Sequence, residues 1–417
     1  MIHKSSLISS RNKHLLIQKM SKPTDVSLNP SFSEKHCSQL AELSAEIFRE
    51  TGALQQIVPG ERTHQEIARL VSRINGYYSN LIAGIRTPPL EVESAISEAF
   101  GERPRDANSQ TSLVAHIETE RLMRENLESA DADFSAHSPD FIRWLHAEFY
   151  NHLPDSQRLT KTPSGRDSPV EPGAFRDQDI TIGRHQPPPP REVPTILAEF
   201  DRYFSDENWL ATDRLLVVAA AHHRLAWVHP FLDGNGRVAR LYSHACLIQA
   251  KVDGGGLWSL SRGLARHRQH YFDALAGADL LEPFEKRKRL SGNGLGEFSH
   301  FFLETLLDQV KFMKELLQMP AITSRMEKYI YYELAPKKHG EALARLLRAT
   351  FIGGEIARGE VKLITGLRDT AAREVINLAF EHRLIQSSTP KGPLALRFPA
   401  EVLGAYFPRL YLDLPAE

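Results

Sequence analysis

The chain of 417 residues contains little cysteine and no long apolar stretch. Its two cysteines, Cys37 and Cys246, cannot build a disulfide framework, and they exclude zinc sites that need cysteine pairs. The longest apolar candidate, residues 215–228, is interrupted by two histidines and an arginine, and is shorter than the roughly 20 residues of a membrane helix. We therefore expect no membrane span and a reducing, cytoplasmic setting.

The chain also lacks an excess of charge of either sign. Lys and Arg number 51 and Asp and Glu number 52, which gives a net charge of −1 and excludes a global basic field for nucleic acid. A hydrophobic content of 41% and a charged content of 25% are typical of globular proteins. At roughly 150 residues per domain, the length favours two or three domains.

The N-terminus is basic and has no acidic residue among its first twenty positions, but it lacks the continuous apolar core of a signal peptide. A disordered leader is the preferred interpretation, with a transit peptide as the alternative. We predict a leader at 1–30, a helical region at 31–109, a helical core at 110–320 and a further domain at 321–417.

Apolar residues at helical spacing predict most of the secondary structure. Thr63 to Glu66 fits a capping box, and Gly84 suits the C-terminal cap of the same helix. The expected helices lie at 32–56, 63–83, 91–100, 113–125, 139–152, 194–203, 213–226, 236–250 and 298–319. The helix at 213–226 is nearly all apolar, so we expect it to be the buried central helix.

The segment 155–190 differs, because it is rich in Pro, Gly, Ser and charged residues. Within it, 179–182 is predicted to be a short strand, with 174–176 as its hairpin partner. The prolines at 187–190 predict a stiff extended connector.

The C-terminal residues predict helices at 341–351, 359–364 and 368–382, followed by strands at 384–388 and 394–399. This order is the layout of a winged helix. Its candidate recognition helix sets Arg368 and Arg373 against Asp369 and Glu374, which is weak for binding DNA. Protein contact or dimerisation is the alternative role. The basic run at 286–289 is interpreted as a solvated face.

The residues from His229 to Arg240 carry the clearest chemistry. Pro230 and the sequence Gly234-Asn235-Gly236 predict a tight loop that feeds a helix N-terminus, where successive backbone N–H groups form an anion cradle. Arg237 and Arg240 share one helical face and can reach a polyphosphate.

Two further side chains complete this segment. Asp233 at the mouth of the loop can hold Mg²⁺, and His229 can take a proton near neutral pH. Together these groups are typical of a site for phosphoryl or nucleotidyl transfer. His222 and His223 are adjacent and point in different directions on a helix, so we expect them to be structural rather than metal ligands.

Residues 229–237 resemble the motif H-P-F-x-[D/E]-G-N-[G/K]-R of the Fic (Fido) family, which they match at every position. A chance match in a chain of this length is on the order of one in ten million. The resemblance covers roughly residues 110–310 and implies a mainly α-helical Fic-type core with a β-hairpin flap. It implies a protein adenylyltransferase that moves AMP from ATP to a hydroxyl of a target protein, with Mg²⁺.

The resemblance also implies roles for individual residues. His229 would be the base, Asp233 the metal ligand, and Phe231 the anchor of the loop in the core. The phosphates would be held by Gly234, Asn235, Gly236, Arg237, Val238, Ala239 and Arg240. Tyr271 is similar to a position near the nucleoside, with a plain core residue as the alternative. The flap, with Ile180, Thr181, Ile182 and Gly183, would pair with the target's backbone.

A second family motif, [S/T]-x-x-x-E-[G/N], is matched at Ser79 and Gly84, but Ala83 stands where the glutamate belongs. In the family that glutamate pairs with the second motif arginine, here Arg240, and inhibits the enzyme. A methyl group cannot form this pair, so we expect the chain to lack that inhibition. The sequence leaves open whether Ala83 is natural or introduced.

The expected function is therefore AMP transfer to a Ser, Thr or Tyr of a target protein, with self-modification and a homodimer as further expectations. Gly236, where some relatives have Lys, favours AMP transfer over a kinase-like reaction. The alternatives are transfer of another phosphate-containing group, removal of AMP, or a DNA-binding regulator whose core senses nucleotide.

Overall fold

The structure is a computed structural model that describes residues 26–86, 107–129, 135–161, 165–204, 211–284, 287–336 and 338–411. The expected helix at 91–100 and most of the expected leader lie outside the described residues. The chain divides into two compact units. Unit 1 is Met1–Ile47, Glu118–Ala250 and Leu264–Leu307, and unit 2 is Phe48–Ile117, Lys251–Gly263 and Asp308–Glu417. The four predicted domain boundaries stay a prediction.

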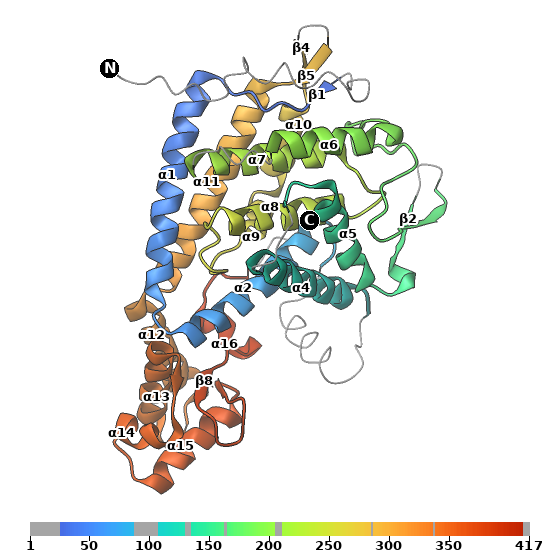
Figure 1. Cartoon of the computed structure of the whole chain (residues 1–417). Coiled ribbons are helices and arrows are strands. Elements are labelled where there is room, and N and C mark those ends of the chain that lie inside the picture. Colours follow the sequence, from blue (N-terminus) through green and yellow to red (C-terminus); the bar gives the residue numbers. More distant parts are fainter. Residues whose placement is uncertain are drawn as a thin grey trace, which may run out of the picture. The chain divides into compact units, whose positions relative to one another are not determined.

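Unit 1 is mainly helical and is built around α7 (Figure 1). Its own helices are α5 (Pro139–Asn151), α6 (Val193–Phe204), α7 (Ala211–Val228), α8 (Asn235–Gln249) and α10 (Arg268–Ala278), with 3-10 turns η1 (Asp155–Gln157) and η2 (Pro190–Glu192). Both units share α1 (Glu34–Ile57), α4 (Ala107–Glu128), α9 (Leu260–Arg266) and α11 (Gly292–Leu316).

The expectation of a buried central helix is confirmed for α7. Every side chain from Leu215 to Leu225 is buried, the histidines and the arginine among them. The helix packs against α8 and α6, and α5 packs against these same two helices. Because α7 has no polar face, it can be stable only when it is enclosed in this way, and its enclosure fixes where the loop after Val228 begins.

Two small sheets complete unit 1. One joins β1 (Val26–Ser27), β5 (Arg287–Leu290) and β4 (Leu281–Phe284), with β1 parallel to β5 and β4 antiparallel to it. The other pairs β2 (Leu159–Lys161) with β3 (Asp167–Pro169). The basic run interpreted as a solvated face therefore belongs largely to a strand, in which Arg289 pairs with Glu282 of β4 at 2.7 Å.

Unit 2 contains further helices and an antiparallel sheet in the order β6-β8-β7. Its own helices are α2 (Glu61–Ile82), α12 (Met319–Lys328), α13 (Gly340–Gly353), α14 (Val361–Thr365), α15 (Asp369–Glu381) and α16 (Ala400–Tyr406), with a π-helical turn η3 (Tyr329–Leu334) and a 3-10 turn η4 (Arg358–Glu360). Its strands are β6 (Glu355–Ile356), β7 (Ile385–Gln386) and β8 (Leu394–Leu396). The C-terminal helices and strands lie at the predicted positions, although both strands are shorter than predicted.

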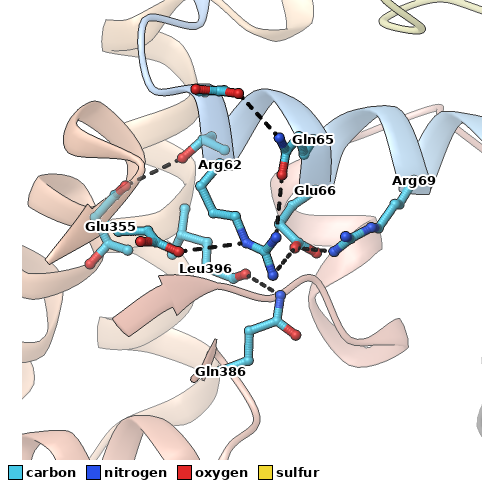
Figure 2. A network of polar contacts seen from close by, with 10 residues as sticks. Arg62, Gln65, Glu66, Arg69, Glu355, Gln386 and Leu396 are labelled. Carbon is cyan, nitrogen blue, oxygen red and sulfur yellow. Dashed lines mark hydrogen bonds and ion pairs between the residues drawn. The ribbon is translucent and has the colours of Figure 1, made fainter. Parts of the chain in front are cut away.

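The predicted capping box of α2 is wrong. The helix begins at Glu61 after Gly60, and no side chain caps it. The Thr63 hydroxyl instead donates to the carbonyl of Thr350 on α13, at 3.3 Å. Figure 2 shows Glu66 among ion pairs on α2, where it contacts Arg62 at 3.5 Å. Thr63 and Glu66 therefore take part in packing and ion pairing and not in capping, because α2 packs against α13 and β8.

Candidate functional site

The loop between α7 and α8 has two backbone positions in the left-handed region. His229, directly after α7, has φ +48°, and Gly234, the N-cap of α8, has φ +78°. A Cβ at Gly234 would lie 2.8 Å from the ring of Tyr150. Glycine is therefore required at 234 by its conformation and by space, whereas a histidine at φ +48° costs on the order of 1 kcal/mol.

The side chain of Asn235 closes this loop. Its Oδ1 accepts from the N–H of Phe231 at 2.9 Å, and its Nδ2 donates to the carbonyl of Phe231 at 2.8 Å. Phe231 itself has no exposed surface and stacks on His146 with ring centroids 4.0 Å apart. The expected anchoring of the loop by Phe231 is therefore confirmed. Both polar atoms of the Asn235 side chain are used within the loop.

The first turn of α8 contains the backbone N–H groups that were predicted to form an anion cradle. The first carbonyl acceptor inside the helix is that of Gly234, which takes the N–H of Val238 at 3.0 Å. The N–H groups of Asn235, Gly236 and Arg237 precede this bond and have no acceptor one turn back. Such groups bind phosphate at a helix N-terminus. The side chains of Val238 and Ala239 are 2% and 1% exposed and pack in the interior.

The ring of His229 is uncharged and has a defined tautomer. Its Nδ1 lies 3.1 Å from the carbonyl of Ala226, and because a carbonyl only accepts, the ring proton belongs on Nδ1. The lone pair on Nε2 is then free to take a proton. Burial lowers the pKa of His229 to about 4, so the ring is uncharged at neutral pH.

Asp233 belongs to a triangle with Tyr150 and Arg237. The Tyr150 hydroxyl donates to Asp233 Oδ2 at 2.6 Å and accepts from Arg237 Nη2 at 3.1 Å. Arg237 Nη2 also lies 3.0 Å from Asp233 Oδ2. Burial raises the pKa of Asp233, but the charge of Arg237 and the bonds from Tyr150 and the Gly234 amide outweigh it and lower the pKa below its usual value. Asp233 is therefore ionised at neutral pH.

The side chain of Arg240 lies close to the first turn of α8. A Cβ at Gly236 would be 3.3 Å from its Nη1, so the guanidinium is close to the cradle. Burial lowers the pKa of Arg240 to about 10, which leaves it charged at neutral pH. Its hydrogen-bond partner is Tyr271, which is 2% exposed and also bonds to His222 Nε2 at 2.8 Å. Tyr271 is thus a core residue that holds Arg240, and its expected place near a nucleoside stays a prediction.

The predicted flap hairpin is wrong as a regular hairpin. Residues 174–181 form no strand, and the only pairing is a bridge between Ile182 and His185 around Gly183, whose φ is +57°. Ile180 is half-buried, while Thr181 and Ile182 are exposed. The segment instead binds the end of α7 through Arg176 and His185.

The second motif lies at the end of α2 in unit 2, whereas residues 229–240 lie in unit 1. Gly84, with φ +87°, follows the last helical residue Ile82 and the C-cap Ala83, so the expected glycine cap is confirmed. Ser79 is fully buried and Ala83 is exposed. The inhibitory role of this segment stays a prediction.

Sequence analysis did not single out four residues of the site, namely His146, Tyr150, Arg176 and His185. His146 and Tyr150 lie four residues apart on α5, so their shared face was a usable signal. Arg176 and His185 lie in an irregular segment, where no periodicity marks them. The structural interpretation of His222 and His223 is confirmed, since both are buried and hydrogen-bonded to protein groups.

Among the residues described, no cluster of three or more His, Cys, Asp and Glu side chains could hold a metal ion. Asp233 is the carboxylate at the loop. No helix in the described ranges is both long enough and apolar enough to cross a bilayer.

Part of the chain, including the loop between α7 and α8, is similar to known proteins. Residues 134–247 match the Fic/DOC family. The protein adenylyltransferase Fic of Drosophila yakuba is 30% identical over 132 residues, which cover 32% of this chain and 26% of that protein. The same protein of Drosophila ananassae is 33% identical over 98 residues, which cover 24% and 20%. The chain thus matches about a quarter or less of each curated relative.

Two solved structures share the fold. A Fic family protein from Desulfovibrio desulfuricans G20 has a TM-score of 0.51 at 19% identity, over 88% of this chain and 98% of that one. Fic-1 (residues 134–508) from C. elegans has a TM-score of 0.50 at 19% identity, over 69% and 76%. The expected mainly α-helical, Fic-type fold is confirmed.

Proposed function

We propose that this chain is a protein adenylyltransferase that moves AMP from ATP to a Ser, Thr or Tyr hydroxyl of a target protein. The observation that carries the proposal is the loop at 229–240. It joins a neutral histidine with a free Nε2, helix N-terminal amides and two arginines within one short segment. The adenylyltransferase relatives at about 30% identity support the same reaction class.

In the proposed reaction, the target hydroxyl oxygen attacks the α-phosphorus of ATP. Its proton goes to Nε2 of His229, and the bond from the α-phosphorus to the bridging oxygen breaks, so that pyrophosphate leaves. The backbone N–H groups of Asn235, Gly236 and Arg237 hold the phosphates, and Arg240 adds a positive charge beside them.

Asp233 would hold Mg²⁺, and its environment fits this ion. Its side chain is 43% exposed, and a carboxylate keeps acceptor positions beyond those that Tyr150 and Arg237 occupy. Mg²⁺ is commonly bound by one or two carboxylates together with substrate phosphates, whose charge it neutralises. That no larger cluster of ligands lies among the described residues is compatible with such a site.

The segment 176–188 would receive the target. Ile182 exchanges both of its backbone hydrogen bonds with His185. The backbone of the exposed Thr181 beside it can therefore pair with an extended stretch of another protein. Such pairing would bring the target hydroxyl to His229.

Ala83 would leave the enzyme without its usual inhibition. Ala83→Glu should then reduce self-labelling with radiolabelled ATP at least several-fold, since the glutamate of the family motif pairs with the second motif arginine and repels the γ-phosphate. Ala83→Gln, which has the same size without the charge, is the matched control and should retain the labelling. Equal labelling of all three proteins would contradict this part of the proposal.

A second candidate function is a DNA-binding regulator, in which the C-terminal elements form a winged helix. The observation that favours it is a groove of about 430 Å³ at α14 and α15, lined by Arg358, Lys362 and Arg373 with Asp369 as its acidic side chain. A gel-shift assay at moderate salt, with Lys362→Glu as the comparison, tests this function. The absence of a shift would refute this function and leave protein contact as the alternative role of these elements.

The decisive experiment incubates the protein with labelled ATP in a lysate, beside His229→Ala. We expect His229→Ala to lose transfer by several orders of magnitude while it still binds ATP, and mass spectrometry should find an added AMP. An added group of another mass would identify a different transfer reaction at this site. Undiminished labelling by His229→Ala would refute the mechanism.

A further inference from the structure

The carbonyl groups at the end of α7 all accept hydrogen bonds, although a helix leaves its last carbonyls without N–H donors inside it. Leu225 accepts from the N–H of His229 at 3.2 Å, and Ala226 accepts from the His229 ring. The carbonyl of Trp227 accepts from His185 Nε2 at 2.8 Å. The carbonyl of Val228, the last residue of α7, accepts from Arg176, and so do the carbonyls of the next two residues.

Arg176 is 4% exposed. Its hydrogen bonds reach His229 and the residue on either side of it. Its Nε donates to the carbonyl of His229 at 2.8 Å, its Nη2 to that of Val228 at 3.5 Å, and its backbone N–H to that of Pro230 at 2.9 Å. No acidic side chain pairs with this guanidinium among its described hydrogen bonds, so its donors are directed at backbone carbonyls.

The same guanidinium also binds the segment that would receive the target. Its Nη1 donates to the carbonyl of Gln178 at 3.2 Å, and its Nη2 donates to that of Pro188. These two residues lie near the start and the end of the segment 176–188. One buried side chain therefore fixes both the base of the flap and the backbone of the histidine.

His229 needs such support, because its φ of +48° is unfavourable for a residue with a side chain. Conformations of this kind persist only where surrounding contacts hold them. The bond from Arg176 Nε to the His229 carbonyl acts on the residue whose backbone is strained. Without it, the backbone can relax and carry the imidazole away from its place.

We propose that Arg176 is a positioning residue, which holds His229 in its left-handed conformation and couples the base to the flap. The inference rests on the proposed transfer function, since it assigns a purpose to the placement of His229. His185, which caps Trp227 from the same segment and contacts Asp279 at 3.5 Å, supports the same end of α7.

Arg143 provides a matched control. It is also an arginine at the base of the flap, and its Nε donates to the carbonyl of Gly173 at 2.9 Å while its guanidinium lies over Phe175. No described hydrogen bond links it to the residues from Val228 to Pro230. Arg143→Met therefore removes a comparable flap contact and leaves the support of His229 in place.

The experiment measures ATP affinity, transfer rate and the His229 ring signal in wild type, Arg176→Met, Arg176→Lys and Arg143→Met. We expect Arg176→Met to reduce kcat for transfer at least tenfold with ATP affinity changed less than threefold, because the phosphate-binding groups lie on α8. Arg176→Lys, with one amine for several carbonyls, should recover only part of the rate. Arg143→Met should keep kcat within threefold of wild type.

The ring signal separates this inference from the proposed function. The ¹³Cε1–¹Hε1 NMR signal of His229, assigned by its loss in His229→Asn, should shift or split in Arg176→Met and stay in Arg143→Met. A wild type without any transfer but with this NMR change would refute the function and keep the positioning role. An unmoved signal in a folded Arg176→Met or Arg176→Lys protein, or an unchanged kcat, would overturn the positioning role.

Discussion

Tyr150 shows how one hydroxyl can serve two motif residues. It donates to Asp233, accepts from Arg237 and leaves no room for a side chain at Gly234. Its ring stacks on His146, whose ring stacks in turn on Phe231. The orientation of the proposed metal ligand therefore depends on a residue of α5, outside the motif.

Replacing Tyr150 by Phe should weaken the use of Mg²⁺. The variant keeps the ring contacts but removes a 2.6 Å bond to the carboxylate of Asp233, and a hydrogen bond to a charged group is worth about 1.5–3 kcal/mol. We expect the Mg²⁺ concentration for half-maximal transfer to rise roughly 10- to 100-fold at saturating ATP.

Tyr242→Phe is the control for this prediction. Tyr242 is also buried, and its hydroxyl bonds to Nδ1 of His137 at 2.6 Å, away from the loop. Its loss should lower stability and leave the Mg²⁺ dependence of transfer unchanged. The same Mg²⁺ dependence in wild type and Tyr150→Phe would argue against the role of this hydroxyl.

Among the elements, α2 depends on close backbone contact at its start. A Cβ at Gly60 would lie 2.5 Å from the backbone nitrogen of Gly354, which follows α13. The hydroxyl of Thr63 reaches the carbonyl of Thr350 on the same helix. At its other end, the Tyr78 hydroxyl donates to the carbonyl of Leu410 at 3.1 Å. The C-terminal region therefore holds α2, which carries the second motif, at both ends.

We expect Gly60→Ala to destabilise the protein by about 1–3 kcal/mol, because neither backbone can move aside without loss of packing. Gly52→Ala is the matched variant, since Gly52 lies inside α1 and a Cβ there meets no atom within 4 Å. That change should stabilise the helix by up to about 1 kcal/mol. Urea unfolding measures both, and equal midpoints would contradict the prediction.

At the scale of the molecule, unit 1 encloses several histidines in the neutral state. Burial lowers the pKa of each of them to about 4, or to about 3 for His222. They are His137, His146, His222, His223 and His229. Their burial is part of the same enclosure of α7 and α8 that positions the loop.

Stability should therefore fall with acidification well before most carboxylates titrate. A histidine with a folded pKa below its unfolded value of 6.5 contributes stability that is full above pH 6.5 and is lost as the pH falls from 6.5 toward the folded pKa. Each contributes up to about 1.4 kcal/mol per pH unit in that window. Unfolding midpoints at pH 7.5, 6.5 and 5.5 should fall steadily, and His222→Gln should reduce the slope. A slope that His222→Gln leaves unchanged would count against this account.

The helices could be predicted where the apolar pattern and the capping residues of the helix itself set its burial and its ends. The run from Leu215 to Leu225 predicted burial, and Gly84 predicted the end of α2. The capping box at Thr63 and the hairpin at 179–182 failed for a common reason. In both cases the residues form hydrogen bonds to a distant segment instead of the predicted local partner. Thr63 bonds to Thr350, and Arg176 of the predicted hairpin bonds to the end of α7.

The sequence by itself determined the chemistry of the candidate site, because its base, carboxylate, amides and arginines lie within twelve neighbouring residues, from His229 to Arg240. The tertiary structure decided what holds them in place. Tyr150 orients Asp233, Tyr271 bonds to Arg240, and Arg176 supports the backbone of His229. These partners come from distant segments of the sequence, and only the packing around α7 and α8 brings them within hydrogen-bonding distance of the loop.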